Sequence, residues 1–219
     1  MKRIMLFSIL TILLFAVTAT AGQTKQITPD EPQESISRYP IPKFETLPED
    51  IKKTFLAVQE SMGFIPNVFF AMAHRPDEFR AYLAYGKALM KRDSGLTPAE
   101  KEMIVLATSN DSGCQYCVIS HGASLRIKAK DKYIAEPIAI NYREAPITPR
   151  QKAMIDFAMK VSKDSRAIAE SDFHTLQSHG FSKEDVWDIA GITAFFGLSN
   201  RMMNFAAVHP DEEFYMMGR

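Results

Sequence analysis

The side chains of this chain best suited to chemistry lie in the stretch SGCQYCVISHGASLR, residues 112–126. Cys114 and Cys117 are its only two cysteines, and His121 follows the second by four residues. Spacings of three and four residues place all three side chains on one face of a helix. Free backbone N–H groups in the first turn of that helix favour a thiolate. The pattern fits a redox pair, a metal site or an inert local disulfide.

The spacing of the cysteines and histidines argues against a metal site and against covalently bound haem. A structural zinc site takes four ligands and a catalytic one usually three, whereas the other histidines show no ligand spacing with the pair: His74, His174, His179 and His209. Covalent c-type haem requires a histidine directly after the second cysteine, and Val118 occupies that position. A thioredoxin-like centre would need a βαβ pattern, which is lacking. We therefore expect no metal and no cofactor, while an inert disulfide closing a short loop remains an alternative.

Residues 1–21 have the pattern of a secretory signal peptide. Basic Lys2 and Arg3 precede the apolar run IMLFSILTILLFAV, and Ala19-Thr20-Ala21 forms a small-x-small cleavage site. The run is shorter than the ~20 residues that a spanning helix needs. We expect cleavage after Ala21 and export, to the periplasm or outside the cell, where disulfides persist. A retained N-terminal membrane anchor is the lesser alternative.

The charge and length of the mature chain narrow the function classes. Loss of Lys2 and Arg3 leaves 24 of 26 basic side chains against 26 acidic ones. A balance so close to neutral gives no reason to expect nucleic acid or an anionic membrane as partner. About 200 residues suit one domain with a sizeable core.

The remaining chain divides into a linker and a helical domain. Residues 22–47 are polar and rich in proline, which predicts a linker or an extended arm. Residues 48–219 carry helical periodicity and no convincing strand, so the class is all-α. The expected helices span about 48–62, 76–92, 98–109, 114–128, 130–140, 149–162, 169–179 and 183–207. Trp187, Phe195 and Phe196 are interpreted as core of the last helix.

An internal repeat links two of these helices. TPAEKEMIVLA from Thr97 recurs as TPRQKAMIDFA from Thr148, with the same threonine cap and first-turn proline. The repeat predicts two related helical units packed together. Glu102 of the first copy is Ala153 in the second, and no cysteine follows there.

The segment LTPAEKEMIVLATSNDSGCQYCVISHGASLR resembles the active-site segment of the alkylhydroperoxidase D-like, carboxymuconolactone decarboxylase superfamily, in particular its peroxidase-related branch. The family pattern is a glutamate, then twelve residues on a C-x-x-C pair, then a histidine four past the second cysteine. Glu102, Cys114, Cys117 and His121 match each position. MGFIPNVFFAMAHRPDEF and ITAFFGLSNRMMNF resemble the flanking segments, so the likeness covers about 48–205.

The resemblance implies an AhpD-like all-α fold that is usually oligomeric, with the cysteines in a cleft beside the glutamate. We accordingly expect a homo-oligomer, a trimer or a multiple of one. Cys117 would be the peroxidatic thiolate, and Cys114, expected to be the more exposed, would resolve it to a disulfide. Glu102 and His121 would form a proton relay. The best-known members have a histidine where this chain has Tyr116, which could serve only as a hydrogen-bond donor near neutral pH.

These features predict a thiol-dependent peroxidase that reduces hydrogen or organic peroxides with electrons from an unknown thiol reductant. An exported thiol–disulfide oxidoreductase is one alternative. A non-enzymatic helical oligomer with a structural disulfide is the other. Asn200 and Arg201 are structural or line the cleft of a neighbouring subunit.

Overall fold

The structure is a computed structural model that describes residues 36–219. The expected signal peptide and the first part of the expected linker lie outside the described residues. Within them the chain is all-α, as expected, and contains no strand. The helices are α1 (Glu49–Met62), α2 (Asn67–Met72), α3 (Pro76–Lys91), α4 (Pro98–Asp111), α5 (Gln115–Ala129), α6 (Ala135–Asn141), α7 (Pro149–Asp164), α8 (Glu170–Ser178), α9 (Lys183–Ala206) and α10 (Glu212–Met216), with short 3-10 turns at Phe44–Thr46 and Ser165–Ala167.

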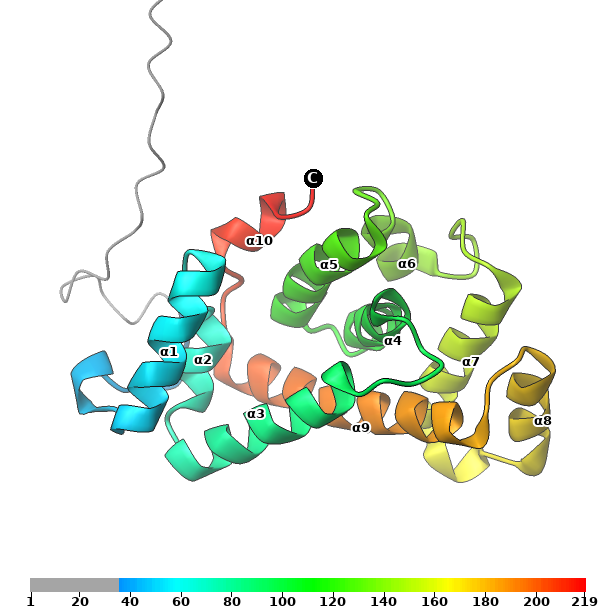
Figure 1. The fold of residues 1–219 in the computed structure, drawn as a ribbon, viewed down its shortest axis with the longest axis horizontal. Helices are drawn as coiled ribbons and strands as arrows, with labels where there is room; N and C mark the ends of the chain where they lie inside the picture. The colour runs from blue at the N-terminus through cyan, green and yellow to red at the C-terminus, as the bar shows by residue number, and fades with distance from the viewer. Residues whose placement is uncertain (1–35) are drawn as a thin grey trace, which may run out of the picture.

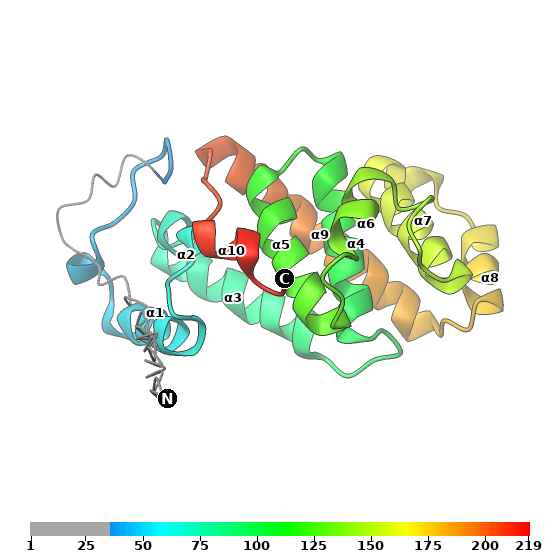
Figure 2. The same cartoon turned by 90° about the horizontal axis from the view of Figure 1, so that it is seen from above.

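Helix α4 is the centre of the fold, with α5, α6, α7 and α9 packed around it (Figure 1). Residues 100–109 of α4 are buried on every side of the helix. Seen from above, helix α9 passes beneath α4 and α5 with α3 beside it, while α1 and α2 lie at one end of the molecule next to α10 (Figure 2). The site therefore rests on a helix that has no solvent-facing side over most of its length.

The two copies of the internal repeat form α4 and α7, which begin in the same way. Thr97 and Thr148 each accept a hydrogen bond from the backbone three residues on, and Glu100 and Gln151 complete the two capping boxes. The two helices pack against each other, as the repeat predicts. Local sequence thus fixes where the helix that carries Glu102 starts.

Two clusters of buried side chains make up the core. One surrounds α4, α7 and α9. The other lies at the end formed by α1, α2 and α10, and it includes both cysteines and Tyr116. Phe55 is fully buried there among four aromatic rings: Phe44, Phe69, Phe70 and Phe79. The cysteine pair is therefore part of a packed core.

Several expectations differ from the structure. The helix expected near 130–140 begins only at Ala135, because Lys130 adopts a left-handed conformation (φ 53°) that ends α5. The short helices α2 and α10 were not foreseen. Trp187 is not core but 72% exposed, whereas Phe195 and Phe196 are buried as expected. No helix in the described part of the chain is long and apolar enough to cross a membrane.

The described part of the arm lies on its own chain. The backbone N–H of Arg38 donates to the Ala206 carbonyl at 2.8 Å, and that of His209 donates to the Ile36 carbonyl at 2.9 Å. Ser37 adds a side-chain hydrogen bond to Ala206 at 2.9 Å. These contacts tie the arm to the segment between α9 and α10.

We expect Phe55→Ala to destabilise the protein by about 3–5 kcal/mol, because it leaves a cavity among aromatic rings. Leu56→Ala is the matched control, since Leu56 is 51% exposed on the same helix and should cost far less. Urea unfolding followed by circular dichroism measures both. Equal losses for the two variants would contradict this description of the N-terminal core.

Candidate redox site

A tight turn between α4 and α5 places the first cysteine. Gly113 has φ +62°, a conformation that glycine adopts without steric cost. The Cys114 backbone N–H donates to the Ser109 carbonyl at 3.0 Å. Cys114 is the N-cap of α5, and its Sγ accepts a hydrogen bond from the Cys117 backbone N–H at 3.3 Å. The sulfur therefore occupies the position where a helix N-terminus favours negative charge.

Cys114 and Cys117 form a disulfide, with their Cα atoms 5.3 Å apart. The expectation that Cys114 is the more exposed cysteine is wrong: it is 0% exposed and Cys117 is 2% exposed. Packing from the N-terminal core covers both residues. The exposure of the two cysteines therefore does not indicate which one would attack the peroxide and which one would form the disulfide with it.

Glu102 on α4 is brought against His121 on α5. Its Oε2 lies 2.7 Å from His121 Nδ1, and its Oε1 accepts a hydrogen bond from Lys128 Nζ. Only 3% of the Glu102 side chain is exposed. Burial alone would raise the pKa of this carboxyl, but the charges and hydrogen bonds of His121 and Lys128 outweigh burial and lower the pKa. Glu102 is therefore a buried carboxylate with two partners.

Lys128 is a member of this cluster that the sequence interpretation missed. It follows His121 by seven residues, two helical turns along the same face of α5. That spacing was the available signal, but a surface lysine near a helix C-terminus has an ordinary explanation. The imidazole also meets α9, where the centres of the His121 and Phe196 rings are 4.7 Å apart in a T-shaped arrangement.

Tyr116 has a different environment from that of the relay residues. Its hydroxyl donates to Asp211 Oδ2 at 3.1 Å and accepts from the Val68 backbone N–H at 3.3 Å. Burial and the Asp211 charge raise the pKa of Tyr116 well above its usual value. Among the hydrogen bonds of the described residues, none joins Tyr116 to Glu102 or His121. Tyr116 instead clamps α5 to the segments that begin α2 and α10.

Asn200 and Arg201 lie on α9 in different environments. Asn200 is fully buried and its Oδ1 accepts from Ser109 Oγ at 2.9 Å, directly before the turn to Cys114. Arg201 is on the surface, where its Nη1 donates to the Gly197 carbonyl at 2.6 Å. Asn200 therefore supports the turn from within the subunit.

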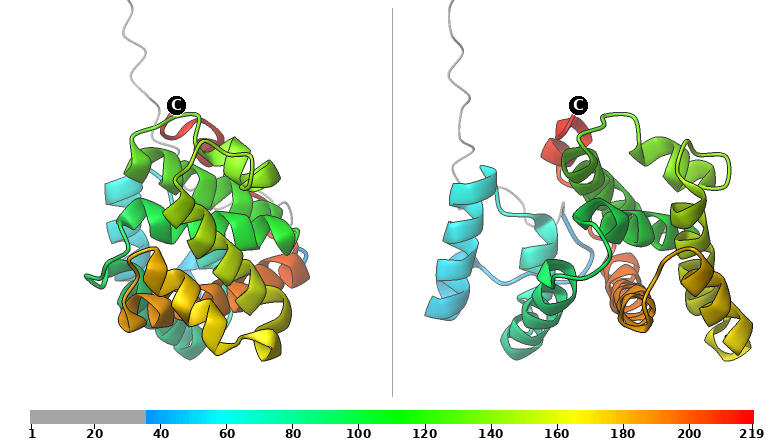
Figure 3. Two further views of the ribbon diagram at one scale, coloured as in Figure 1. Left: turned by 90° about the vertical axis from the view of Figure 1, so that its right-hand side faces the viewer. Right: turned by 45° about the vertical axis from the view of Figure 1, so that its right-hand side comes forward.

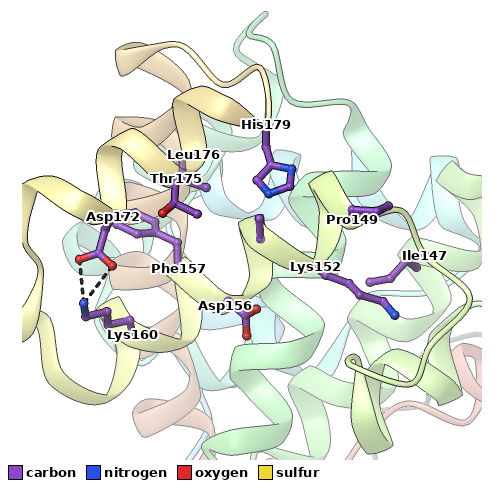
Figure 4. Close-up of a pocket in the computed structure, with 11 residues that line it drawn as sticks. Ile147, Pro149, Lys152, Asp156, Phe157, Lys160, Asp172, Thr175, Leu176 and His179 are labelled. Atoms are coloured by element: carbon purple, nitrogen blue, oxygen red, sulfur yellow. Dashed lines mark hydrogen bonds and ion pairs between the residues drawn. The ribbon is translucent and has the colours of Figure 1, made fainter.

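A pocket of about 500 Å³ lies between α7 and α8, away from these residues (Figure 4). Ala153, the repeat counterpart of Glu102, lines it together with Phe157 and Leu176, and Lys160 pairs with Asp172 at its side. None of Glu102, Cys114, Cys117 and His121 lines this pocket. Across the described residues, no group of three or more His, Cys, Asp or Glu side chains could hold a metal ion.

Comparison with known proteins places this geometry in a family. The carboxymuconolactone decarboxylase family model matches residues 76–140. An uncharacterised peroxidase-related protein of Ralstonia eutropha, with an alkylhydroperoxidase AhpD core, is 57% identical (84% of this chain, 97% of that one, TM-score 0.83). A peroxidase-related protein of Silicibacter sp. is 36% identical (90% and 100%, TM-score 0.80). The debrominase Bmp8, 18% identical (84% and 95%, TM-score 0.68), shares the fold. No curated protein matches.

The Tyr116 clamp predicts a pH-dependent stability. Burial raises the pKa of Asp211 from 3.8 to about 6, and hydrogen bonds from Asn67 and Tyr116 offset this only in part. The folded protein then binds more protons than the unfolded chain between these values, so stability falls as the pH rises through this range. At ~1.36 kcal/mol per pKa unit, the loss is about 2–3 kcal/mol.

The unfolding free energies of the wild type and Asp211→Asn should be measured between pH ~4 and ~7, where their difference isolates this carboxyl. We expect the wild type to lose stability relative to Asp211→Asn as the pH rises. A difference that stays constant over the whole range would show that Asp211 titrates normally.

Proposed function

Because the chain belongs to the alkylhydroperoxidase AhpD-like, carboxymuconolactone decarboxylase superfamily, we propose that it is a thiol-dependent peroxidase acting through Cys114 and Cys117. The observation that carries the proposal is the buried Glu102 carboxylate, hydrogen-bonded to the histidine one turn after Cys117. An inert bridge has no need of a buried acid–base pair beside the helix that carries it. The substrates would be hydrogen peroxide or organic peroxides.

In the proposed cycle the Cys117 thiolate attacks one peroxide oxygen and the O–O bond breaks. The leaving oxygen takes a proton and departs as water or an alcohol, while Cys117 becomes a sulfenic acid. The Cys114 sulfur then attacks the sulfenic sulfur, and the departing hydroxyl takes a proton to form water. This yields the disulfide, the state that the structure contains. An external dithiol, or two thiols, would return two electrons and two protons.

Glu102 and His121 supply the protons of this cycle in a way that suits their geometry. With Nδ1 committed to Glu102, the imidazole has Nε2 left for proton exchange with Cys117 or the peroxide. The buried carboxylate stabilises the protonated imidazole that forms when the thiol ionises. Lys128 stabilises the charged form of Glu102, so that Glu102 remains a carboxylate that can pair with His121.

One observation favours the alternative of a structural disulfide, namely the burial of both cysteines. A thiol–disulfide oxidoreductase would share the cysteine chemistry but show no useful rate with peroxide. The relay separates these alternatives, because only peroxide reduction needs a proton delivered to a leaving oxygen.

Glu102→Gln and His121→Ala should each slow peroxide consumption by the reduced protein about 10²–10⁴-fold, the usual value of general acid–base catalysis. Because the two groups act as a unit, the double variant should be scarcely slower than the worse single one. Cys117→Ser should abolish turnover. Stopped-flow rates followed by thiol counting measure all four variants.

Glu100→Gln is the matched control for these variants. Glu100 lies two positions before Glu102 in the same buried stretch of α4 and pairs with Arg150, and glutamine preserves its capping box. Its peroxide rate should equal that of the wild type. Wild-type rates in both Glu102→Gln and His121→Ala would refute the relay, and full activity in Cys117→Ser would refute the assignment of the cysteines.

Lys128→Met should move the acidic limb of the pH–rate profile to higher pH. Lys128 lowers the pKa of Glu102, so its loss raises that pKa and the relay loses its carboxylate at a higher pH. Lys128→Arg retains the charge and should leave the limb close to its original position. Coinciding profiles for the methionine variant and the wild type would show that Lys128 has no electrostatic part in the relay.

A further inference from the structure

The pocket between α7 and α8 is separate from the redox site. These two helices lie at the opposite end of the molecule from α1 (Figure 3). The volume of the pocket, about 500 Å³, is within the range of sites that bind small molecules. Its lining comes from α8, from α7 and from the residues just before α7. The cycle proposed above uses none of these residues, so the pocket has no part in it.

The internal repeat shows what distinguishes this place from its counterpart in the first copy. In the first copy Glu102 fills the face of α4 that meets α5, where it pairs with His121. In the second copy Ala153 takes that position, and its side chain ends at Cβ. The equivalent face of α7 borders the pocket instead. The chain therefore has an open space where its own repeat has a buried, charged contact.

Much of the pocket wall is apolar. Phe157 of α7 and Leu176 of α8 contribute large side chains, and Ile147 and Pro149 continue the apolar lining to the start of α7 (Figure 4). Ala153 adds a methyl group to the same wall. Covering such a surface removes apolar area from water, which is favourable. The body of a ligand for this pocket should therefore be aliphatic or aromatic.

The charged side chains around the pocket leave one cation without an anionic partner. Lys160 pairs with Asp172 at 2.7 Å, and Asp156 pairs with Arg143 at 2.6 Å. Lys152 takes part in no ion pair of the described residues, and its Nζ donates to the Arg143 carbonyl at 2.6 Å. Three cations thus face two anions, and the excess positive charge lies at Lys152.

Lys152 also has hydrogen-bonding capacity left over. Its repeat counterpart, Lys101, is 2% exposed and donates to two backbone carbonyls, those of Leu89 and Arg92. Lys152 makes only the second of these contacts, again to a carbonyl nine residues before it. Because an ammonium group has three donors, two N–H groups of Lys152 remain for a ligand.

We propose that this pocket binds a small amphipathic carboxylate, with its apolar body against Phe157 and Leu176 and its carboxylate at Lys152. A charge-assisted hydrogen bond between ammonium and carboxylate is stronger than one between neutral groups. A cationic ligand would be repelled by the same ammonium, and a neutral ligand would gain less from it. The proposal goes beyond the peroxidase activity and does not depend on it.

Octanoate is the probe for this site, because it joins one carboxylate to a short aliphatic chain. Added to the isotope-labelled mature protein, it should shift the amide NMR signals of α7 and α8 saturably. Octan-1-ol and octylammonium carry the same chain with a neutral and a cationic head, and each should bind about ten-fold more weakly or worse. No saturable shift with octanoate, shifts confined to other helices, or an equal affinity for octanol or octylammonium would overturn the proposal.

Two variants test the two parts of the site. Ala153→Leu fills the space and should abolish octanoate binding, whereas Lys152→Met removes the ammonium and should weaken binding about ten-fold. Lys152→Arg keeps the charge and should retain most of the affinity. Lys87→Met is the matched control, because Lys87 is an exposed lysine of α3 outside the pocket, and its affinity should be that of the wild type.

Circular dichroism verifies that each variant is folded, and the comparison of the three probes on the wild type needs no variant at all. All four variants should consume peroxide at the wild-type rate, since the pocket is separate from the redox site. An octanoate affinity in folded Lys152→Met equal to that of Lys87→Met would overturn the assignment of the carboxylate to Lys152. Unchanged binding in folded Ala153→Leu would overturn the location of the site.

Discussion

The buried carboxylate of Glu102 is the constraint around which α4 and α5 are arranged. A charge removed from water costs several kcal/mol unless it is paired and hydrogen-bonded. Both of its partners, His121 and Lys128, come from α5 at a spacing of two turns, so they meet the two carboxylate oxygens only when α5 lies along α4 in one register. The same register brings the disulfide to the end of α4. In the repeat, Ala153 imposes no such requirement, and an open pocket lies there instead.

The chemistry proposed for the cysteines is constrained by their burial. With Cys114 at 0% and Cys117 at 2% exposure, neither can meet a thiol reductant unless the surrounding segments open. The segments that cover them are short and are held by apolar packing and by polar contacts that include the Tyr116 hydroxyl and the Asp211 carboxylate. Burial raises the pKa of the Asp211 carboxyl. A reductant would therefore reach the cysteines only if these segments moved away from the packed core around them.

The sequence was sufficient to predict those features that depend on residues close together in the chain. Capping boxes located the starts of α4 and α7, and one motif brought Glu102, His121 and the cysteines together. Lys128 was missed because a lysine near a helix end has an ordinary explanation. The function of Tyr116 depends on Asp211, ninety-five residues away, a distance at which spacing carries no information. Trp187 was misplaced because α9 has apolar residues on both its buried and its exposed faces, and periodicity does not distinguish a face covered by its own chain from a face left open.

Helix α9 supports two parts of the candidate site. On its inner side Phe196 lies against the ring of His121, and Asn200 supports the turn that carries Cys114. Its outer side carries exposed apolar side chains, including Trp187, Leu198 and Phe205. Side chains in a packed core resist displacement, so the position of α9 sets where the imidazole sits relative to Glu102. The orientation of the His121 ring and the turn that carries Cys114 therefore depend on the same helix.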